Sequence, residues 1–334
     1  MRVDIGVFAH NEKAGIAAMV AELGRQDIAQ NPDVRVLILA NGCTDDTVTL
    51  ARTAAHGTRI EVIDLPLGGK SRTWNRFVHN LSRPDADVLL FCDADIELPL
   101  PDTLSRLVGG LMSRPDLHAF NSRPVKDIAH HPHGLTRLDR LIAMAGGTLD
   151  DWKTAICGQL YAMPAGVARR FHLPIGLPVE DGFLRAMILT NALTSPENLT
   201  LIDGAEVFHI YASERTIPAL IKHQTRIVIG SAINAACFAA LRDTDPNVRH
   251  QTLSAIAKDE SWLARTIRAR LPRFPFGYVP LHFLTKRAAN LARAPRDLLR
   301  PKRLFVLIAG FGFDLIVYLN AQFRMTRGTG AGHW

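Results

Sequence analysis

Two carboxylates one residue apart, Asp93 and Asp95, follow directly after an uncharged run at residues 88–92. Such a pair supplies hard oxygen ligands on one short segment, which suits Mg²⁺ or Mn²⁺ bridging a diphosphate. The apolar run is typical of a strand buried on both faces of a parallel sheet. Carboxylates at the end of such a strand lie where open α/β sheets bind ligands. The alternative is a surface loop whose aspartates cap the next helix.

The elements that would position this pair alternate along the chain. Segments with helical periodicity separate strand-like runs at residues 3–9, 34–40, 59–63 and 87–91. Strand and helix therefore recur about every fifteen residues, the pattern of right-handed βαβ units around a parallel sheet. Polar groups follow the other strands too: Asn11 and Glu12, then Asn41, then Lys70 after two glycines. Because the carboxyl ends of parallel strands share one edge, a nucleotide is expected there.

The pattern continues beyond the acidic pair and then changes. Helices are expected at residues 104–112, 132–144 and 183–188, and strands at residues 118–124, 155–163 and 199–208. From Ile217 onward the periodicity is that of long helices. We therefore predict an α/β domain over residues 1–215, with a mostly parallel central sheet flanked by helices. A helical C-terminal region is predicted over residues 216–334.

Several classes are disfavoured by what the sequence lacks. The Gly-Gly-Lys segment is too short for a P-loop, and there is no GxGxxG, which argues against an NTPase and a dehydrogenase. The four cysteines lie far apart without a CxxC pair, which argues against a zinc site or a disulfide framework and fits a reducing cytosol. No signal-peptide pattern opens the sequence.

Basic residues are concentrated in the C-terminal third. Residues 262–303 contain eleven lysines and arginines and one acidic residue, Asp297, in a chain of net charge +7. Such a block favours an anionic membrane surface. Nucleic acid is disfavoured as a partner because aromatic residues are not interleaved with the basic ones.

The most apolar stretch, residues 304–319, follows this block. As a helix it would reach about 24 Å, short of the ~30 Å bilayer core, and Asp314 would cost ~2.5–3.5 kcal/mol at mid-bilayer. A helix lying in the membrane interface is therefore favoured over a full span or a buried core helix. This predicts peripheral or shallow attachment at the cytoplasmic side of the inner membrane and a lipid or lipid-linked acceptor.

Five motifs in order resemble the family 2 glycosyltransferases with the GT-A (Rossmann-like) fold, over roughly residues 3–230. They are Phe8-Ala9-His10-Asn11-Glu12, Asn41-Gly42-Cys43-Thr44-Asp45-Asp46-Thr47, Gly69-Lys70-Ser71-Arg72-Thr73-Trp74-Asn75, Cys92-Asp93-Ala94-Asp95 and Val179-Glu180-Asp181. The resemblance implies an inverting, metal-dependent hexosyltransferase (EC 2.4) that moves one sugar from a UDP- or GDP-linked donor.

The resemblance also implies roles for single residues. Asp95 would ligate Mg²⁺ or Mn²⁺ directly, Asp93 would contact the metal or the ribose, and His209 would be a third ligand. Asp181 would accept the proton of the acceptor hydroxyl, with Glu180 placing the acceptor. The residues expected to bind the nucleotide sugar are Ala9, Asn11, Glu12, Asn41, Lys70, Asp93, Ala94, Gln224 and Arg226.

The sequence departs from the family pattern at two points. Ala40 stands where many members carry an aspartate that reads uracil, which leaves the base open. His223-Gln224-Thr225-Arg226-Ile227 lacks the leading Gln and final Trp of the processive Gln-x-x-Arg-Trp signature, which favours transfer of a single sugar.

Structural alternatives remain for the same residues. Glu180 and Asp181 could be favourable anions in the first turn of a helix, Lys70 an exposed helix-start lysine, and His209 a structural histidine. The segment at 223–227 could be a buried helix face. Two alternative functions are a nucleotidyltransferase that makes a sugar nucleotide and a non-catalytic sugar-nucleotide-binding scaffold.

Overall fold

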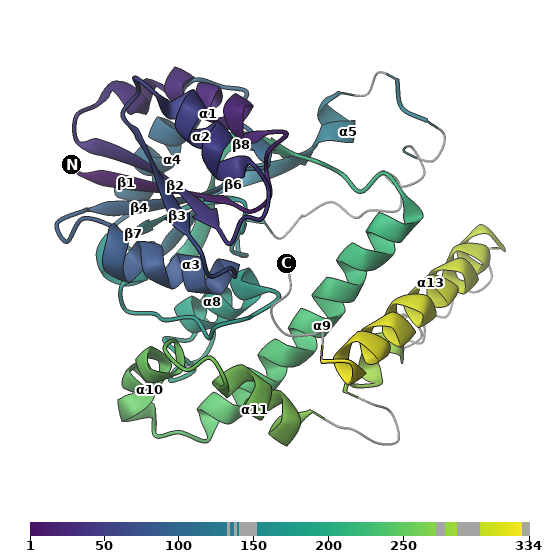
Figure 1. Ribbon diagram of the computed structural model, residues 1–334. Helices are drawn as coiled ribbons and strands as arrows, with labels where there is room; N and C mark the ends of the chain where they lie inside the picture. The colour runs from purple at the N-terminus through teal and green to yellow at the C-terminus, as the bar shows by residue number, and fades with distance from the viewer. Residues whose placement is uncertain (132–133, 137–138, 140–151, 272–277, 286–300, 329–334) are drawn as a thin grey trace. The chain divides into compact units, whose positions relative to one another are not determined.

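The computed structural model describes residues 1–131, 134–136, 139, 152–271, 278–285 and 301–328, with the side chains of 301–308 left out (Figure 1). The chain divides into two compact units. The first comprises residues 1–175, 180–213 and 244–260, and the second comprises residues 176–179, 214–243 and 261–334. The predicted domain boundary after residue 215 stays a prediction. The helix expected at residues 132–144 falls almost entirely outside the described residues.

The first unit is built on one eight-stranded sheet. Its strands are β1 (Val3–Ala9), β2 (Val34–Asn41), β3 (Ile60–Leu65), β4 (Val88–Asp93), β5 (Ile96–Glu97), β6 (Ala119–Lys126), β7 (Leu160–Pro164) and β8 (Ile202–Tyr211). Their spatial order is β3-β2-β1-β4-β7-β6-β8-β5. The first four are parallel, β7 runs antiparallel to β4 and β6, β6 and β8 are parallel, and β5 is antiparallel to β8. The α/β prediction is confirmed, and the sheet is mixed.

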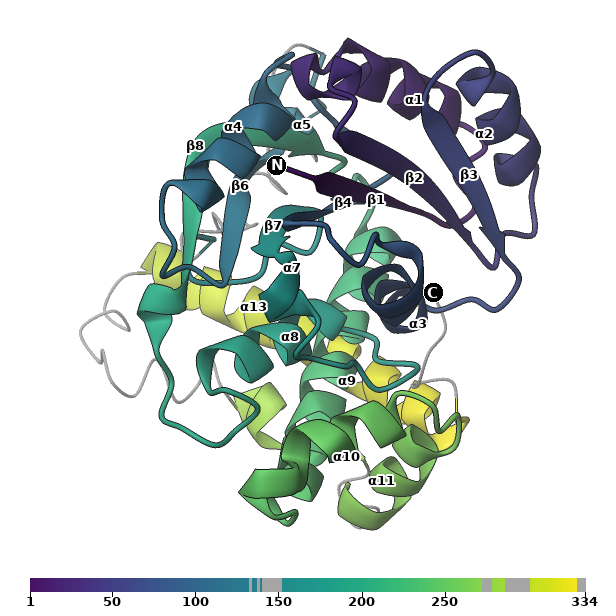
Figure 2. The same ribbon diagram turned by 90° about the vertical axis from the view of Figure 1, so that its left-hand side faces the viewer.

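Helices connect the strands of the first unit and follow the last of them. They are α1 (Ile16–Arg25), α2 (Thr47–Ala55), α3 (Lys70–Arg76), α4 (Thr103–Met112), α5 (Asp127–His130), α7 (Ala165–Ala168), α8 (Glu180–Leu189) and α10 (Arg249–Ile256), with short 3₁₀ or π turns η1 (Asp27–Gln30), η2 (Phe77–Leu81), η3 (Leu199–Leu201) and η4 (Pro246–Val248). Helices α1 and α2 lie over one face of the parallel strands and α3 over the other (Figure 2). Helix α1 buries Ile16, Met19, Val20 and Leu23, the i, i+3, i+4, i+7 set of an amphipathic helix.

Stacked aromatic rings attach α3 to the sheet. Phe91 on β4 stacks on Tyr161 at 4.6 Å and on Trp74 at 5.7 Å between ring centroids, and Phe77 meets it edge-on at 5.4 Å. The Trp74 indole N–H donates to the Tyr161 hydroxyl at 3.0 Å. Buried aromatic pairs add about 0.5–1.5 kcal/mol each beyond the area they bury. This packing fixes the start of α3, where Lys70 lies, against β4.

Two predicted strands begin later than expected. β7 starts at Leu160, because residues 155–159 form a turn held by the buried Asn121 amide, which donates to Ala155 O and accepts from the Cys157 N–H. β8 starts at Ile202, after the 3₁₀ turn η3, and extends to Tyr211. The apolar residues of both regions led to a strand prediction over their full length. Local side-chain hydrogen bonds set where each strand begins.

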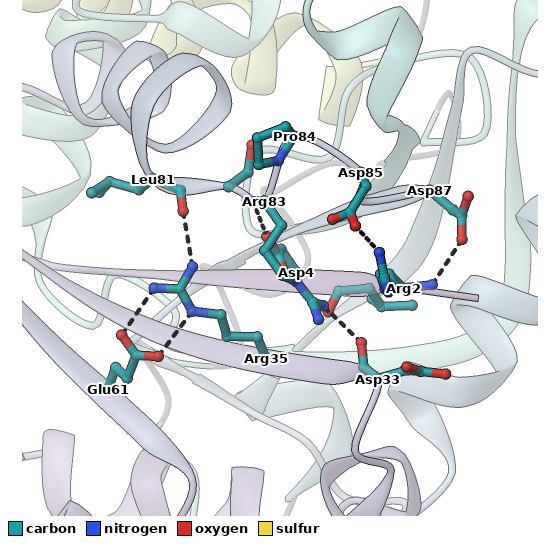
Figure 3. Close-up of polar contacts among 12 residues, drawn as sticks. Arg2, Asp4, Asp33, Arg35, Glu61, Leu81, Arg83, Pro84, Asp85 and Asp87 are labelled. Carbon is teal, nitrogen blue, oxygen red and sulfur yellow. Dashed lines mark hydrogen bonds and ion pairs between the residues drawn. The ribbon is translucent and has the colours of Figure 1, made fainter.

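Ion pairs occupy the amino-terminal ends of the parallel strands (Figure 3). Buried Asp4 on β1 accepts from the Arg83 N–H at 2.6 Å and from its Nε at 2.7 Å. Arg35 on β2 donates through Nε and Nη2 to Glu61 on β3, both at 2.9 Å. Arg2 pairs with Asp85. The charged side chains of this network are therefore paired with one another within the chain.

The second unit is helical where the structure describes it. Its helices are α9 (Ile217–Arg242), α11 (Trp262–Arg270) and α13 (Pro301–Thr326), and both α11 and α13 pack against α9 (Figure 1). Thr216 caps α9 by accepting from the Ala219 N–H. Among the described residues, α9 is the one helix long and apolar enough to cross a membrane, judged by length and composition. Half of its most apolar stretch is buried within the protein.

Candidate active site

The register of the parallel strands brings the predicted residues to one edge. Phe8 of β1 lies opposite Asp93 of β4, and Ala9 lies opposite Ala40 of β2. The segments that follow, Asn11-Glu12, Asn41 and Asp93-Ala94-Asp95, therefore leave the sheet side by side. The Ala94 N–H donates to Phe8 O at 3.0 Å, which ties the acidic turn to β1. Both Ala9 and Ala94 are buried in this edge.

The turn after β2 is bound to the end of β1 by hydrogen bonds. The Asn11 side chain accepts from the Thr44 N–H at 2.8 Å, and the Glu12 N–H donates to Thr47 Oγ1 at 2.7 Å. The His10 ring lies 2.6 Å from Asn41 O. Asn11 has φ +57°, a left-handed conformation that asparagine tolerates better than most residues. The Asn41 Oδ1 atom is buried and has no hydrogen-bond partner among the residues that the structure describes.

A close backbone approach brings the loop before α3 to this turn. Gly42 has φ +57°, and its N–H donates to Leu65 O at 2.7 Å. A Cβ at position 42 would lie 2.6 Å from the Gly68 Cα. Only glycine fits here, because any side chain would collide with backbone that cannot yield. The Asn-Gly turn and the Gly-Gly-Lys turn are therefore one structural unit.

Lys70, the first residue of α3, lies at the centre of the polar cluster. Its Nζ is 2.7 Å from the Asp93 carboxylate and 3.4 Å from Glu180 Oε1, and it donates to Gly158 O at 3.0 Å. Burial works against the charged amine, but the two carboxylates outweigh it and raise the pKa of Lys70. The exposed helix-start alternative is wrong, since only 14% of this side chain is accessible.

The carboxylates around Lys70 repel one another. Burial raises the pKa of Asp93 to about 7, with Asp95 adding to the shift and Lys70 opposing it. Burial also raises the pKa of Glu12, and the carboxylates of Asp95 and Asp45 contribute. Like charges brought this close favour either protonation or a cation between them. The cluster is thus an acidic site with a single lysine against β4.

The donor set suits a hard divalent cation that is shared with a substrate. Asp93 and Asp95 offer carboxylate oxygens, the ligands that Mg²⁺ and Mn²⁺ prefer. In the described part of the chain, no three histidine, cysteine, aspartate or glutamate side chains are grouped closely enough to hold an ion by themselves. One or two carboxylates completed by phosphate oxygens is the usual arrangement for Mg²⁺. The residues therefore fit such an ion.

His209 has hydrogen-bond partners at both ring nitrogens. It is fully buried on β8, with Nδ1 3.1 Å from Ser122 Oγ and Nε2 3.0 Å from Gln159 Oε1. Burial lowers the pKa of His209 to about 3, so the ring is neutral. Its assignment as a third metal ligand stays a prediction.

Gln159 is a site residue that the sequence did not reveal. Its side chain contacts His209, and its backbone carbonyl accepts from the Asp93 N–H at 2.8 Å. It therefore orients the first residue of the acidic turn. The available signal was a polar Gly158-Gln159 pair interrupting an otherwise apolar run at residues 155–163.

Glu180 and Asp181 open α8 next to Gly158. Glu180 is buried and faces Lys70, whereas Asp181 is partly exposed and accepts from the Gly182 N–H at 2.7 Å. A Cβ at Gly158 would lie 3.2 Å from Asp181 Oδ2, so this glycine permits the carboxylate to approach. Lys70 thus connects the acidic turn after β4 to the start of α8. Both carboxylates do occupy a helix first turn, where the helix dipole also favours them.

Gln224 and Arg226 belong to the second unit, on α9. Residues 225–227 are buried or half-buried, and the neighbouring His223 pairs with Glu214 at 2.9 Å. The assignment of Gln224 and Arg226 to the nucleotide sugar stays a prediction.

Residues 4–163 match the model of the glycosyl transferase family 2. This part of the chain, just under half of its length, is similar to the family 2 glycosyltransferases. The match runs through the strands from β1 to β7 and includes the strand-end turns and the acidic pair. The resemblance seen in the first four motifs is confirmed, and Val179-Glu180-Asp181 lies beyond the match. A search of curated proteins found no match.

Solved glycosyltransferases share the fold of this domain. A mannosyltransferase, PcManGT from Pyrobaculum calidifontis, solved with GDP-Man and Mn²⁺, has a TM-score of 0.56 at 18% identity, covering 96% of this chain and 86% of the other. Glucosyl-3-phosphoglycerate synthase from Mycobacterium tuberculosis, solved with Mn²⁺, UDP-Glc and phosphoglyceric acid, has a TM-score of 0.50 at 18% identity, covering 72% and 80%. The GT-A fold is therefore confirmed.

Proposed function

We propose that the chain is a metal-dependent, inverting glycosyltransferase that moves one hexose from a UDP- or GDP-linked donor to a lipid or lipid-linked acceptor. The observation that carries the proposal is the Lys70 bridge within a family 2 domain. Its Nζ contacts Asp93, from the acidic turn after β4, and Glu180, at the start of α8. One buried lysine thus contacts both the acidic turn and Glu180, the neighbour of the candidate base Asp181.

The two sides of that bridge match the two needs of sugar transfer. As the donor breaks, negative charge develops on the leaving diphosphate. Asp93 and Asp95 would hold Mg²⁺ or Mn²⁺, which supplies Lewis-acid neutralisation of that charge. Both solved relatives described above were crystallised with Mn²⁺ and a nucleotide sugar, which supports this choice of cofactor and donor.

Asp181 would accept the proton of the attacking hydroxyl. It is partly exposed and lies beside Gly158, whose carbonyl Lys70 holds. A positioned carboxylate typically contributes ~10²–10⁴ in rate. Glu180, buried against Lys70, would fix the start of α8 and so the direction of the Asp181 carboxylate. Direct attack from the face opposite the diphosphate would invert the anomeric carbon.

The acceptor and location rest on the C-terminal region. Eleven basic residues between positions 262 and 303 precede an apolar helix, a combination suited to an anionic membrane surface. We place the enzyme at the cytoplasmic face of the inner membrane, where a lipid or lipid-linked acceptor would be available.

The test is sugar transfer with purified full-length protein. UDP- and GDP-hexoses are supplied with Mn²⁺, with Mg²⁺ or with EDTA, and release of nucleoside diphosphate is followed alongside lipid-extract acceptors. We expect turnover with metal and none with EDTA. Asp95→Ala should abolish turnover, whereas the matched control Asp102→Ala, at an exposed position before α4, should retain it.

Two results would overturn the proposal. Release of pyrophosphate from a nucleoside triphosphate and a sugar phosphate would indicate a nucleotidyltransferase. Metal-dependent binding of a nucleotide sugar without any turnover across donors and acceptors would indicate a scaffold. An Asp95→Ala enzyme with full activity would remove the metal assignment.

A further inference from the structure

Helix α13 exposes a continuous row of large apolar side chains. Five of them are between 37% and 57% accessible: Phe311, Leu315, Ile316, Leu319 and Phe323. We call these residues the α13 outer stripe. With 3.6 residues per turn they fall within an arc of about 140°. A row of this size on a folded protein marks an interaction surface, because single exposed apolar residues are normal but contiguous ones are not.

The opposite side of the same helix is attached to the protein. Val317, Ala321 and Met325 are buried. At the edge of the stripe near Phe311 and Leu315, the Tyr318 hydroxyl and the Gln322 amide both donate to Val279 O, at 3.0 and 2.8 Å. The stripe is therefore a surface that the described part of the second unit leaves exposed, on a helix whose other face packs against the protein.

Basic side chains border the stripe. The Arg327 guanidinium lies 4.0 Å from the centroid of the Phe323 ring, and Arg324 Nε donates to Asn320 Oδ1 at 3.1 Å. Helical spacing places Asn320, Arg324 and Arg327 along one edge of the row. Arginine beside aromatic and aliphatic side chains suits the headgroup level of an anionic membrane, where the stem lies among apolar groups and the charge meets phosphate.

We propose that α13 lies in the plane of an anionic bilayer, with the outer stripe inserted among the acyl chains and Arg324 and Arg327 at the phosphates. This sharpens the membrane part of the proposed function and rests on it. Asp314 and Arg324 divide the helix into uncharged runs at residues 304–313 and 315–323. Each run reaches about 15 Å, half of the ~30 Å hydrocarbon core, so neither can span it.

The test is partitioning of the full chain onto vesicles of phosphatidylcholine alone or with phosphatidylglycerol. Leu319→Glu combined with Phe323→Glu should lower partitioning onto anionic vesicles at least about tenfold. The matched control is Met112→Glu combined with Leu199→Glu, equally exposed apolar positions of the first unit, which should bind as wild type. Leu315→Ser with Leu319→Ser provides a milder variant if the first unfolds. Unchanged partitioning in a folded stripe variant would overturn the proposal.

The orientation of α13 relative to the bilayer is measured by the quenching of a tryptophan introduced into the stripe. The fluorescence of Leu319→Trp is compared with that of wild type in vesicles whose lipids carry bromine at shallow or deep acyl positions. Shallow quenching is expected, and stronger quenching by the deep bromines would indicate a spanning helix and overturn the in-plane arrangement. Metal-dependent hydrolysis of the nucleotide sugar, measured without vesicles, should be equal in the stripe variants and wild type. If hydrolysis is absent while vesicle binding is intact, the proposed function fails and the surface assignment stands.

Discussion

The two ends of the parallel strands β1 to β4 differ in how their charged side chains are paired. At the amino ends Asp4 pairs with Arg83 and Glu61 with Arg35 (Figure 3). At the carboxyl ends Lys70 faces three carboxylates, Asp93, Glu180 and Asp181. Asp95 adds to the negative charge near Asp93, and Glu12 lies near Asp95. The acidic groups at the amino ends are paired with arginines. At the carboxyl ends, carboxylates outnumber this lysine among the residues that the structure describes.

Within one sheet, the charged residues at the amino ends therefore serve stability, and those at the carboxyl ends serve function. Pairing at the amino ends satisfies each buried charge, so those residues serve the fold. Repulsion at the carboxyl ends is a cost that a bound cation would remove, and perturbed carboxylates of this kind are typical of functional sites. Substitutions at the carboxyl ends should therefore mainly change activity, and substitutions at the amino ends should mainly change the free energy of unfolding.

The largest effect is expected on activity at the carboxyl end. Asp181→Asn keeps the side-chain oxygen that accepts from the Gly182 N–H but cannot take up a proton. We expect kcat to fall by ~10²–10⁴ with the unfolding midpoint in urea nearly unchanged. Asp102→Asn serves as the control. Wild-type kcat in Asp181→Asn would remove this residue from the role of base.

At the amino end the main loss should be in stability. Asp4→Ala removes the buried carboxylate that Arg83 binds through two hydrogen bonds. Breaking a buried pair from one side costs about 3–5 kcal/mol, measured by urea unfolding. Asp33→Ala, an exposed partner of the N-terminal amine, should cost under about 1 kcal/mol. Equal effects of the two substitutions would contradict the distinction between buried and exposed pairs.

The third prediction concerns the glycine contact that joins two turns at the carboxyl end. Gly42→Ala forces a side chain into a left-handed backbone position 2.6 Å from the Gly68 Cα. The expected cost is about 1–3 kcal/mol in unfolding free energy, together with weaker binding of the nucleotide sugar by calorimetry. Gly24→Ala in α1, where nothing lies within 4 Å, should instead stabilise by roughly 0.5–1 kcal/mol. A Gly42→Ala protein with unchanged stability and affinity would show that the contact is dispensable.

The smallest effects should appear in the pH dependence of unfolding. Two rings, His79 and His172, stack 3.9 Å apart. Burial lowers the pKa of His172 from 6.5 to about 4, with His79 adding to the shift. The unfolded state then binds more protons between pH 6.5 and 4, so stability falls as the pH is lowered through that window. His172→Gln should flatten this part of the curve, and an unchanged curve would contradict the assignment.

Glu61 should contribute at lower pH. Its hydrogen bond with Arg35 lowers the pKa of the carboxyl below 4.5, so this stabilisation is present above that pH and lost as the pH falls below it. Glu61→Gln should remove about 0.2–1 kcal/mol at pH 7, the range for exposed pairs. A larger loss would mean that the pair is more than a surface contact.

The sequence by itself determined the alternation of strands and helices, the acidic turn and the resemblance to the family 2 glycosyltransferases. These follow from local periodicity and from residues that are close in sequence, such as Asp93 and Asp95. Tertiary structure decided the contacts between distant residues. They are the antiparallel pairing of β7 with β4, the burial of Lys70 between Asp93 and Glu180, and the hydrogen bond from the Asp93 N–H to Gln159 O. These contacts join residues 23 to 110 positions apart.

The same distinction explains α13. The apolar run at residues 304–319 was visible in the sequence, but composition alone could not separate a membrane span from an interfacial or buried helix. Packing decided which side is free, because Tyr318 and Gln322 bind Val279 while Leu319 and Phe323 stay exposed. Side-chain periodicity gives a helix its faces, and only its neighbours in three dimensions determine which face is covered.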